Sequence, residues 1–390
     1  MPWRTMDVRD QRVRFVIEAS QQAGNLAGVC REFGISRPTG YLWLRRYQAA
    51  GVEGLCEHSR RPQQVPGRTG WEVEEQIVEL RRQRPDWGAR KLRVLLQRRG
   101  LEMPVVTIHR VLLRRGLVRE QDRHRPALQR FEREAPNQLW QMDFKSPKGW
   151  NQAIGPLSVL DDCSRFALLL RGTWTTRGEA VQEQLEGAFQ SYGMPAEMLM
   201  DHGIPWWSGQ GPRGWTRLTV WLMKLGVGLL FSGVRHPQTQ GKVERFHGTL
   251  EQARRRRGLP FAELHQAWLD EFREEYNQVR PHEALGMKTP ASVWSPSARR
   301  YHPNPPEWEY GSGSEVQRLG PHGQLKLEGR WWQVCEALAG EAVQLQRVQG
   351  RVLVYYCQTL VREIDLVESS STAFPPSLRS VGNPVELEKV

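Results

Sequence analysis

The sequence lacks paired cysteines, long hydrophobic runs and an apolar leader. Its five cysteines are scattered and none forms a C-x-x-C pair, which excludes a disulfide framework and a cysteine-rich zinc module. No stretch approaches the roughly 18 apolar residues that cross a bilayer. The N-terminal residues are charged and contain no apolar signal core. We therefore expect a protein of a reducing cytoplasm that makes no membrane contact.

Negative charge is scarce in the first third of the chain. The 390 residues include 55 Lys and Arg against 43 Asp and Glu, a net charge of +12. Of these, 27 basic and 16 acidic residues precede residue 136, so nearly all of the excess lies there. A polyanionic partner explains such an excess, and the planar guanidinium of Arg suits phosphate and guanine edges. A genomic GC bias, which enriches Arg everywhere, is the alternative.

A first helical unit is predicted before residue 58. The apolar spacing predicts a helix from Val8 to Gln21, a tight turn at 34–36, and a further helix capped by Ser36. This order is typical of a helix-turn-helix, whose second helix enters the major groove of DNA. That helix should bury Leu42, Tyr47 and either Trp43 or Leu44. Its outer face carries the candidate DNA contacts Arg37, Thr39, Arg45 and Arg46.

A second helical unit has the same character. WGARKLRVLLQRRG (87–100) and PVVTIHRVLLRRG (104–116) flank a short turn, which favours a second helix-turn-helix. For both units the alternative is a small helical bundle with solvated arginines. The candidate DNA contacts of the second unit are Arg90, Lys91, Thr107 and Arg110.

The pattern after residue 136 is that of an α/β domain. Three strands, a helix, a strand, a helix, a strand and a helix follow in order, which is compatible with a mixed RNase H-like sheet. Short β-patterned runs separated by glycines then predict a small C-terminal β-barrel. We predict helix-turn-helix domains at 1–57 and 71–118, linkers at 58–70 and 119–136, a core at 137–258, a helical extension and hinge at 259–306, a small β-barrel at 307–367 and a disordered tail at 368–390.

Three acidic residues stand where acids are costly. Asp143 interrupts an apolar strand pattern, Asp201 ends the apolar run MLM, and Glu244 lies in the first turn of a helix. A buried carboxylate needs a partner, and a divalent cation is a strong one. Should the two strands be neighbours and the helix pack across them, the three side chains converge. Alternatively, each acid caps a turn or meets an Arg.

Several segments resemble a known family. WQMDF (140–144), VLDDCSRF (159–166), MDHG (200–203) and above all HPQTQGKVERFHGTL (236–250) resemble the integrase-core transposases of bacterial insertion sequences. YNQVRPHEALGMKTPASVW (276–294) resembles the segment that follows the core in that family. The resemblance implies that the catalytic, metal-binding residues are Asp143, Asp201 and Glu244.

The resemblance also implies a reaction and its partners. It implies nicking of double-stranded DNA at the ends of a mobile element, then attack of the freed 3′-hydroxyl on target DNA. Two Mg²⁺ or Mn²⁺ ions would serve both steps. Because two ends are handled together, we expect at least a dimer on DNA. A role for an ATP-dependent accessory protein is left open. The expected location is the bacterial cytoplasm, on the nucleoid.

Other residues are weaker candidates for contacts with DNA. Asp161 and Asp162 are expected to close the turn before Arg165, with metal binding as the alternative. His247 could orient a phosphate or simply pack. The tryptophans Trp206, Trp207 and Trp215 could stack on a base, but core positions are the competing interpretation. The further candidate DNA contacts are Lys242, Arg245, His247, Arg254, Arg255, Arg280 and His282.

Two departures from the family pattern motivate a second hypothesis. His202 stands where the family commonly has Asn, and Glu251 stands where many relatives have Lys or Arg. The chain could therefore be a relative that binds DNA without cutting it. A third hypothesis is an RNase H-fold nuclease that cuts DNA but does not join it.

Overall fold

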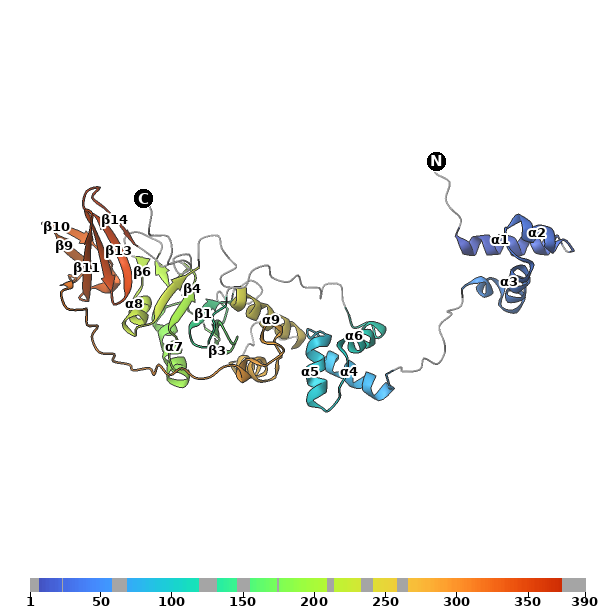
Figure 1. Cartoon of the computed structure of the whole chain (residues 1–390), viewed down its shortest axis with the longest axis horizontal. Coiled ribbons are helices and arrows are strands. Elements are labelled where there is room, and N and C mark those ends of the chain that lie inside the picture. The colour runs from blue at the N-terminus through green and yellow to red at the C-terminus, as the bar shows by residue number, and fades with distance from the viewer. Residues whose placement is uncertain are drawn as a thin grey trace. The chain divides into compact units, whose positions relative to one another are not determined.

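The computed structural model divides the chain into two compact units, Met1–Thr69 and Gly70–Val390 (Figure 1). It describes residues 7–22, 24–57, 69–118, 132–145, 155–173, 175–208, 214–232, 241–257 and 266–373. The predicted linkers at 58–70 and 119–136 lie largely outside the described residues, as does most of the tail from residue 374. Among the described helices, none combines the length and the apolar character that spanning a membrane requires.

The first unit consists of three helices, α1 (Val8–Gln21), α2 (Leu26–Glu32) and α3 (Arg37–Ala50). The turn between α2 and α3 forms because Gly34 takes a φ of 64°, a conformation that costs glycine little. Ser36 then caps α3, its Oγ accepting a hydrogen bond from the backbone N–H of Thr39 over 3.4 Å. The predicted helix boundaries, turn and cap are confirmed.

Close packing at Gly40 sets the face that α3 buries. A Cβ atom at Gly40 would lie 2.5 Å from the sulfur of Cys30, so the two helices approach each other there without a side chain between them. Leu42 follows Gly40 by two positions, lies on the other side of the helix and is 44% exposed. Tyr47 is 38% exposed. The predicted burial of Leu42 and Tyr47 is therefore wrong. Trp43 and Leu44, by contrast, pack against the core of the unit.

The second helical region contains α4 (Trp71–Gln83), α5 (Ala89–Arg98) and α6 (Val105–Arg114). Apolar residues at helical spacing on all three helices bury Trp87, which is 1% exposed. The side chain of Arg81 donates hydrogen bonds to the carbonyls of Trp87 and Leu117. It thereby connects α4 to the residues before α5 and after α6. The helices α5 and α6 match the two predicted segments.

A five-stranded mixed sheet lies at the centre of the core, in the order β3-β2-β1-β4-β7. The first three strands form the predicted antiparallel meander, and β4 and β7 run parallel to β1. This arrangement confirms the mixed sheet of an RNase H-like core. The strands are β1 (Leu139–Phe144), β2 (Leu157–Asp161), β3 (Ala167–Arg171), β4 (Glu197–Met200) and β7 (Gly228–Phe231).

Helices cover both faces of this sheet. Trp140 and Met142 of β1 point to the side covered by α7 (Gly178–Tyr192) and α8 (Arg217–Lys224). The alternate residues of β1 point to the opposite side. Apolar side chains of β2 and β3 pack there against the helices α9 (Gly241–Arg257) and α10 (Gln266–Glu274). The side of α9 is therefore the side on which Asp143 lies.

The chain leaves α10 through irregular helical turns. A π-helical turn covers Glu275–Val279, and short 3-10 turns cover Glu283–Leu285 and Pro290–Ser292. Trp294 then stacks on Phe166 with ring centroids 4.2 Å apart. The predicted helical extension is thus present, and it stays in contact with the core.

The C-terminal region is an open sheet rather than the predicted barrel. Its five strands follow the order β14-β13-β12-β11-β8, and a separate hairpin pairs β9 with β10. Within the described residues the edge strands β8 and β14 do not pair, so no barrel closes. The strands are β8 (Glu315–Arg318), β9 (Gln324–Leu327), β10 (Arg330–Gln333), β11 (Ala342–Val348), β12 (Arg351–Tyr356), β13 (Thr359–Asp365) and β14 (Ser370–Ala373).

The beginning of the predicted disordered tail is ordered. Ser370–Ala373 forms β14 and pairs with Arg362–Asp365 of β13. The nearly fully buried guanidinium of Arg362 donates to Ser371 Oγ over 3.1 Å. These polar residues pair as an edge strand, which leaves one side of the strand in solvent and therefore carries no apolar signature in the sequence.

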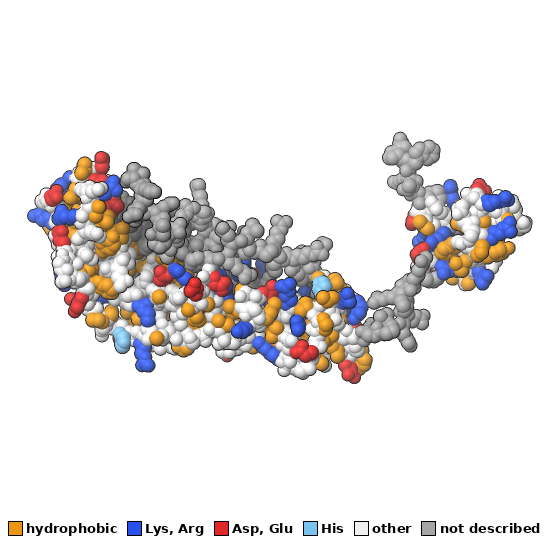
Figure 2. All heavy atoms as spheres, in the orientation of Figure 1, with side chains coloured by type: hydrophobic (Ala, Val, Ile, Leu, Met, Phe, Trp, Pro, Cys, Tyr) orange, Lys and Arg blue, Asp and Glu red, His pale blue; other side chains and the backbone are white. Residues whose placement is uncertain are grey.

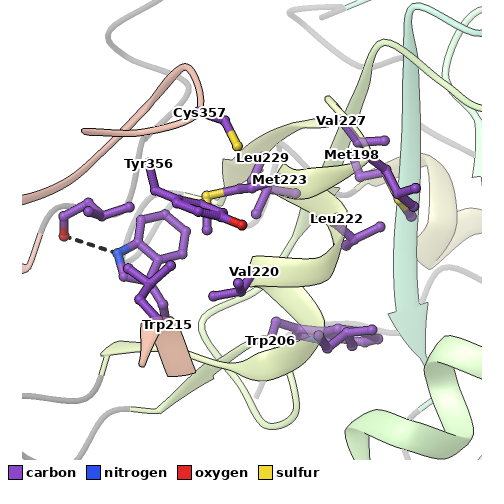
Figure 3. Close-up of a cluster of buried hydrophobic side chains, with 14 of the residues drawn as sticks. Met198, Trp206, Trp215, Val220, Leu222, Met223, Val227, Leu229, Tyr356 and Cys357 are labelled. Carbon is purple, nitrogen blue, oxygen red and sulfur yellow. Dashed lines mark hydrogen bonds between the residues drawn. The ribbon is translucent and has the colours of Figure 1, made fainter. Parts of the chain in front are cut away.

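A buried apolar cluster joins the C-terminal sheet to the core (Figure 3). Trp215 lies in β6 (Gly214–Trp215), which pairs with β5 (Trp207–Ser208) in a hairpin absent from the sequence prediction. Its indole N–H donates to the carbonyl of Val361 over 3.0 Å. Trp206 and Trp215 are 1% and 2% exposed, so the interpretation of these two as base-stacking residues is wrong. Trp215 stabilises the junction between the two sheets, and Trp206 stacks on Phe144 of β1 with ring centroids 5.6 Å apart.

Candidate active site

Asp143 and Asp201 lie level with each other on neighbouring strands. The strands β1 and β4 are parallel, with Gln141 opposite Leu199. Two residues further along each strand, the same register brings Asp143 beside Asp201, which directly follows β4. Both carboxylates fall on the side of the sheet that α9 covers, and neighbouring strands lie about 4.8 Å apart.

A glycine shapes the environment of Asp201. Its Oδ1 accepts a hydrogen bond from the backbone N–H of Gly203 over 2.9 Å. A Cβ atom at Gly203 would stand 3.0 Å from that same oxygen, a crowded contact that glycine avoids. The sequence MDHG thus combines the carboxylate with the turn that holds it.

Glu244, the third acid predicted from the sequence, lies in the first turn of α9 and is exposed. Burial, and after it the negative charges of Asp201 and, more weakly, Glu244, raise the pKa of Asp143 to about 7. Both other predicted acids thus influence Asp143, Asp201 more than Glu244.

His247 lies behind Asp143. Its Nδ1 is 3.8 Å from Asp143 Oδ2, and its Nε2 is 2.9 Å from Ser158 Oγ. Ser158 is paired directly with Asp143 across β1 and β2. Burial lowers the pKa of His247 to about 3, so the imidazole is neutral. The packing interpretation of His247 is the one that this geometry supports.

The neighbouring acids have structural roles. Asp161 Oδ1 accepts hydrogen bonds from the backbone N–H and hydroxyl of Ser164, which closes the turn as expected. Asp162 is fully buried and pairs with Lys242, whose Nζ lies 2.6 Å from Asp162 Oδ1. Lys242 also donates to the carbonyl of Asp162. Lys242 ties α9 to the sheet, and the DNA interface proposed below does not include it.

The donors present suit a divalent cation. Mg²⁺ and Mn²⁺ prefer carboxylate oxygens, and the negative charges of Asp201 and Glu244 contribute, after burial, to the raised pKa of Asp143. In the part of the chain that the structure describes, no three His, Cys, Asp or Glu side chains are close enough to hold an ion as they stand. The chemistry of the group fits a metal, while its three members do not form a closed set of ligands.

The predicted DNA contacts of the first unit lie mostly at its surface. Arg37 and Arg45 are exposed, and Thr39 is partly exposed. Arg46 instead lies over the ring of Trp43, 5.0 Å from its centroid. Basic and apolar side chains alternate on the visible face of this unit (Figure 2). The surface of α3 is therefore available for a polyanionic partner.

The predicted contacts of the second region divide into two groups. Arg110 is exposed on α6 and Thr107 is partly exposed. Arg90, by contrast, forms an ion pair with Glu283 over 3.4 Å. Burial and, to a lesser extent, the charge of Arg280 lower the pKa of Lys91 to about 8. Thr107 and Arg110 thus remain accessible on α6.

Several predicted contacts on and after α9 have intramolecular partners. Arg254 and Arg255 both pair with Glu251, although Arg255 remains 73% exposed. Arg280 is buried and pairs with Asp86 over 2.8 Å. His282 packs edge-on against Tyr276 at 4.8 Å, and burial lowers its pKa to about 3.

Arg245 is exposed on α9. Arg245 and Arg255 are thus the outward-facing members of this group. His236, which precedes α9 in the sequence, lies outside the described residues.

The two departures from the family pattern have structural counterparts. The ring of His202 packs against Phe231 at 5.2 Å and lies edge-on to Trp207 at 6.2 Å. Burial opposes the ionisation of Glu251, but hydrogen bonds from Arg254 and Arg255 outweigh it and lower the pKa of Glu251. His202 therefore packs among aromatic side chains, and Glu251 forms ion pairs with the arginines at the end of α9.

Family models match the segments that contain the three predicted acids. A model described as integrase core domain matches residues 133–237, which include Asp143 and Asp201. A second integrase core domain model matches residues 225–290, which include Glu244. The chain contains an integrase core. A helix-turn-helix domain model matches residues 11–63, and a homeodomain-like domain model matches residues 39–112.

One relative of this chain is a protein of an insertion element. The chain is 27% identical over 224 residues to the insertion element IS407 uncharacterized 31.7 kDa protein of Burkholderia multivorans (strain ATCC 17616 / 249). The match covers 55% of this chain and 78% of the relative. Together with the domain matches, this relative confirms the predicted resemblance to insertion-sequence transposases with an integrase-like core.

Solved structures of retroviral integrases are also similar. A simian T-cell lymphotropic virus intasome in complex with the PP2A regulatory subunit B56 gamma matches at a TM-score of 0.36 and 16% identity, over 77% of this chain and 96% of that chain. The HTLV-2 integrase catalytic core domain in complex with magnesium matches at 0.32 and 14%, over 41% and 97%. The catalytic core domain of BIV integrase matches at 0.31 and 22%, over 40% and 93%.

Two residues at these sites escape prediction from the sequence. Ser158 faces Asp143 across the meander, so the antiparallel register of the two strands could have revealed it. Asp86 binds Arg280, which lies 194 positions away. No local signal marks Asp86, because only the tertiary fold brings the two together.

Proposed function

We propose that the chain is a DNA transposase that nicks the ends of a mobile element and joins them to target DNA. The register that sets Asp143 level with Asp201, with the charge of Glu244 also acting on Asp143, carries this proposal. The integrase core models that match both segments support it.

The acidic residues have a defined task in this proposal. Asp143, Asp201 and Glu244 would hold one or two Mg²⁺ or Mn²⁺ ions, which supply charge stabilisation to an in-line displacement at phosphorus. The chain then needs no covalent nucleophile of its own. His247 and Ser158 restrict the movement of Asp143 from behind. Lys242 fixes the first turn of α9, and with it Glu244, to the sheet.

The chemistry consists of two displacements of the same kind. In the first, a water oxygen attacks a phosphodiester at the element end, and the 3′-hydroxyl leaves. In the second, that hydroxyl attacks a target phosphodiester, and a target 3′-hydroxyl leaves. One acidic site can serve both displacements, because each exchanges one P–O bond for another.

DNA contact is proposed for the outward-facing residues of three helices. Basic and hydroxyl side chains on exposed helices suit phosphate and base edges. At least two copies would act together, since two element ends are handled at once. The ATP-dependent partner finds no support in the comparisons and is not part of the proposal. The proposed contacts are Arg37, Thr39, Arg45, Thr107, Arg110, Arg245 and Arg255.

Isosteric substitution of the acids tests the proposal. Asp143→Asn, Asp201→Asn and Glu244→Gln should each lower the rate of Mn²⁺-dependent plasmid nicking and of strand joining at least about 100-fold, while DNA affinity stays within about threefold because the contacts lie elsewhere. Asp270→Asn, an exposed acid on α10, is the matched control and should keep full activity.

The outcomes separate the competing hypotheses. Wild-type protein that binds DNA but never nicks it would support the binding-only relative. Nicking without joining of a pre-cut 3′-hydroxyl end would support a nuclease. Loss of DNA binding together with activity in the acid variants would contradict a purely catalytic role for the three carboxylates.

A further inference from the structure

A network of ion pairs connects α4–α5 to the segment that follows α10. Arg280 lies 2.8 Å from one oxygen of Asp86, and Arg256 lies 3.3 Å from the other. The side chains of Arg280 and Asp86 are only 10% and 12% exposed. Two arginines thus enclose a single buried carboxylate in the loop between α4 and α5.

A second acid repeats this pattern beside the first. Glu275 lies 3.1 Å from Arg84 of the α4–α5 loop and 3.6 Å from Arg256 of α9. All three side chains are at most 26% exposed. Charges from both sides of the contact therefore alternate, which favours one relative orientation of the two surfaces.

Apolar and backbone contacts complete the surface. Trp87, buried in the α4–α6 core, has Arg84 on one side at 5.0 Å and Arg280 on another at 5.5 Å. Val279 packs against the same core. Arg98 of α5 donates to the carbonyl of Val279 over 3.2 Å. Ion pairs, cation–π contacts and apolar burial thus coincide at one place.

The segment that receives α4–α6 is itself anchored to the core. Within the π-helical turn, Asn277 accepts a hydrogen bond from the N–H of Ala167 and donates one to its carbonyl, over 2.8 and 3.0 Å. Tyr276 packs edge-on against Phe246 of α9 at 4.8 Å. The extra residue of a π turn accommodates both contacts while Arg280 faces Asp86.

We propose that residues 275–283 form a docking seat for the chain's own α4–α6 region. The seat holds this second helical region at a fixed position on the core that carries the three carboxylates. The arginines at this contact, Arg280, Arg256 and Arg84, are paired with Asp86 and Glu275. Arg280 and Arg256 thus serve an intramolecular surface rather than phosphate.

Hydrogen exchange in the full chain, without DNA or metal, tests the seat. Asp86→Arg places a positive charge between Arg256 and Arg280, and breaking a buried pair is strongly unfavourable. Amide exchange in residues 275–283, almost 200 positions away in sequence, should become at least about tenfold faster. Glu102→Arg makes the same charge change at an exposed site of the α4–α6 region and should leave exchange at 275–283 unchanged.

Two further measurements keep the result unambiguous. Asp86→Asn removes the charge with less disturbance and should give a smaller acceleration in the same direction, with exchange in α5 and α6 preserved. Adding Arg280→Asp to Asp86→Arg should restore part of the protection, since opposite charges again face each other. Unchanged exchange in both Asp86 variants, or protection that disappears when the wild-type chain is diluted 100-fold, would overturn docking within one chain.

Discussion

At the scale of single residues, a buried histidine hydrogen-bonds to Ser158 and lies close to the carboxylate of Asp143. His247 contacts Asp143 through one ring nitrogen and Ser158 through the other. The sequence indicated the three acids because each stands in an apolar pattern. It could have indicated Ser158 only through the antiparallel register of β1 and β2, because a lone serine in a strand has no distinctive signature.

The contact between His247 and Ser158 should be measurable in stability. His247→Ala would leave a cavity and an unpartnered Ser158 hydroxyl, and should lower the free energy of unfolding by about 2–3 kcal/mol. Ser158→Ala should cost about 1 kcal/mol. Urea denaturation checks both values.

A double variant serves as the internal control. Since the two residues share one hydrogen bond, the loss in the His247→Ala, Ser158→Ala double variant should be smaller than the sum of the two single losses. Strictly additive losses would contradict a direct contact between them.

The sequence was least informative about which basic residues are already paired with acids. Arg280 is a candidate DNA contact by the family resemblance, and Lys242 because it flanks Glu244, yet each faces an acid from a distant segment. Composition reveals that arginines are in excess, but not which ones are already neutralised. That information exists only in the folded chain.

At the scale of helices and strands, periodicity was a reliable guide. The boundaries of α1 and the cap of α3 follow from apolar spacing and from Ser36. The π turn at Glu275–Val279 could not be predicted, because it depends on Asn277 binding Ala167, 110 positions earlier. The edge strand Ser370–Ala373 was missed because its residues are polar.

The exposed face of α3 leads to a prediction about salt. Arg45 is exposed, whereas Arg46 lies over Trp43. Arg45→Ala should weaken DNA binding and reduce the slope of log affinity against log salt by about 1, which corresponds to one lost phosphate contact. Fluorescence anisotropy at a series of salt concentrations measures this slope.

The adjacent arginine is the matched control. Arg46→Ala should change the slope much less, because its guanidinium packs on the ring of Trp43. Equal slopes for wild type and Arg45→Ala would contradict a groove-facing α3.

At the scale of the whole molecule, the proposed acidic site draws on three segments that lie far apart in sequence. The strands β1 and β4 bring Asp143 level with Asp201, and α9 adds Glu244 from a third segment. The C-terminal sheet attaches to the same core through Trp215. Its predicted closure into a barrel failed because strand patterns show which residues alternate but not which edges meet.

The convergence of the three carboxylates on a metal can be mapped directly. Fe²⁺ replaces Mg²⁺ or Mn²⁺ at oxygen-rich sites, and with ascorbate and peroxide it cleaves the backbone only close to where it is bound. Cleavage is predicted near Asp143, Asp201 and Glu244 in the same reaction, suppressed by excess Mg²⁺ and lost in Asp143→Asn. Cleavage near only one of the three acids, or cleavage that Asp143→Asn leaves unchanged, would contradict a shared metal site.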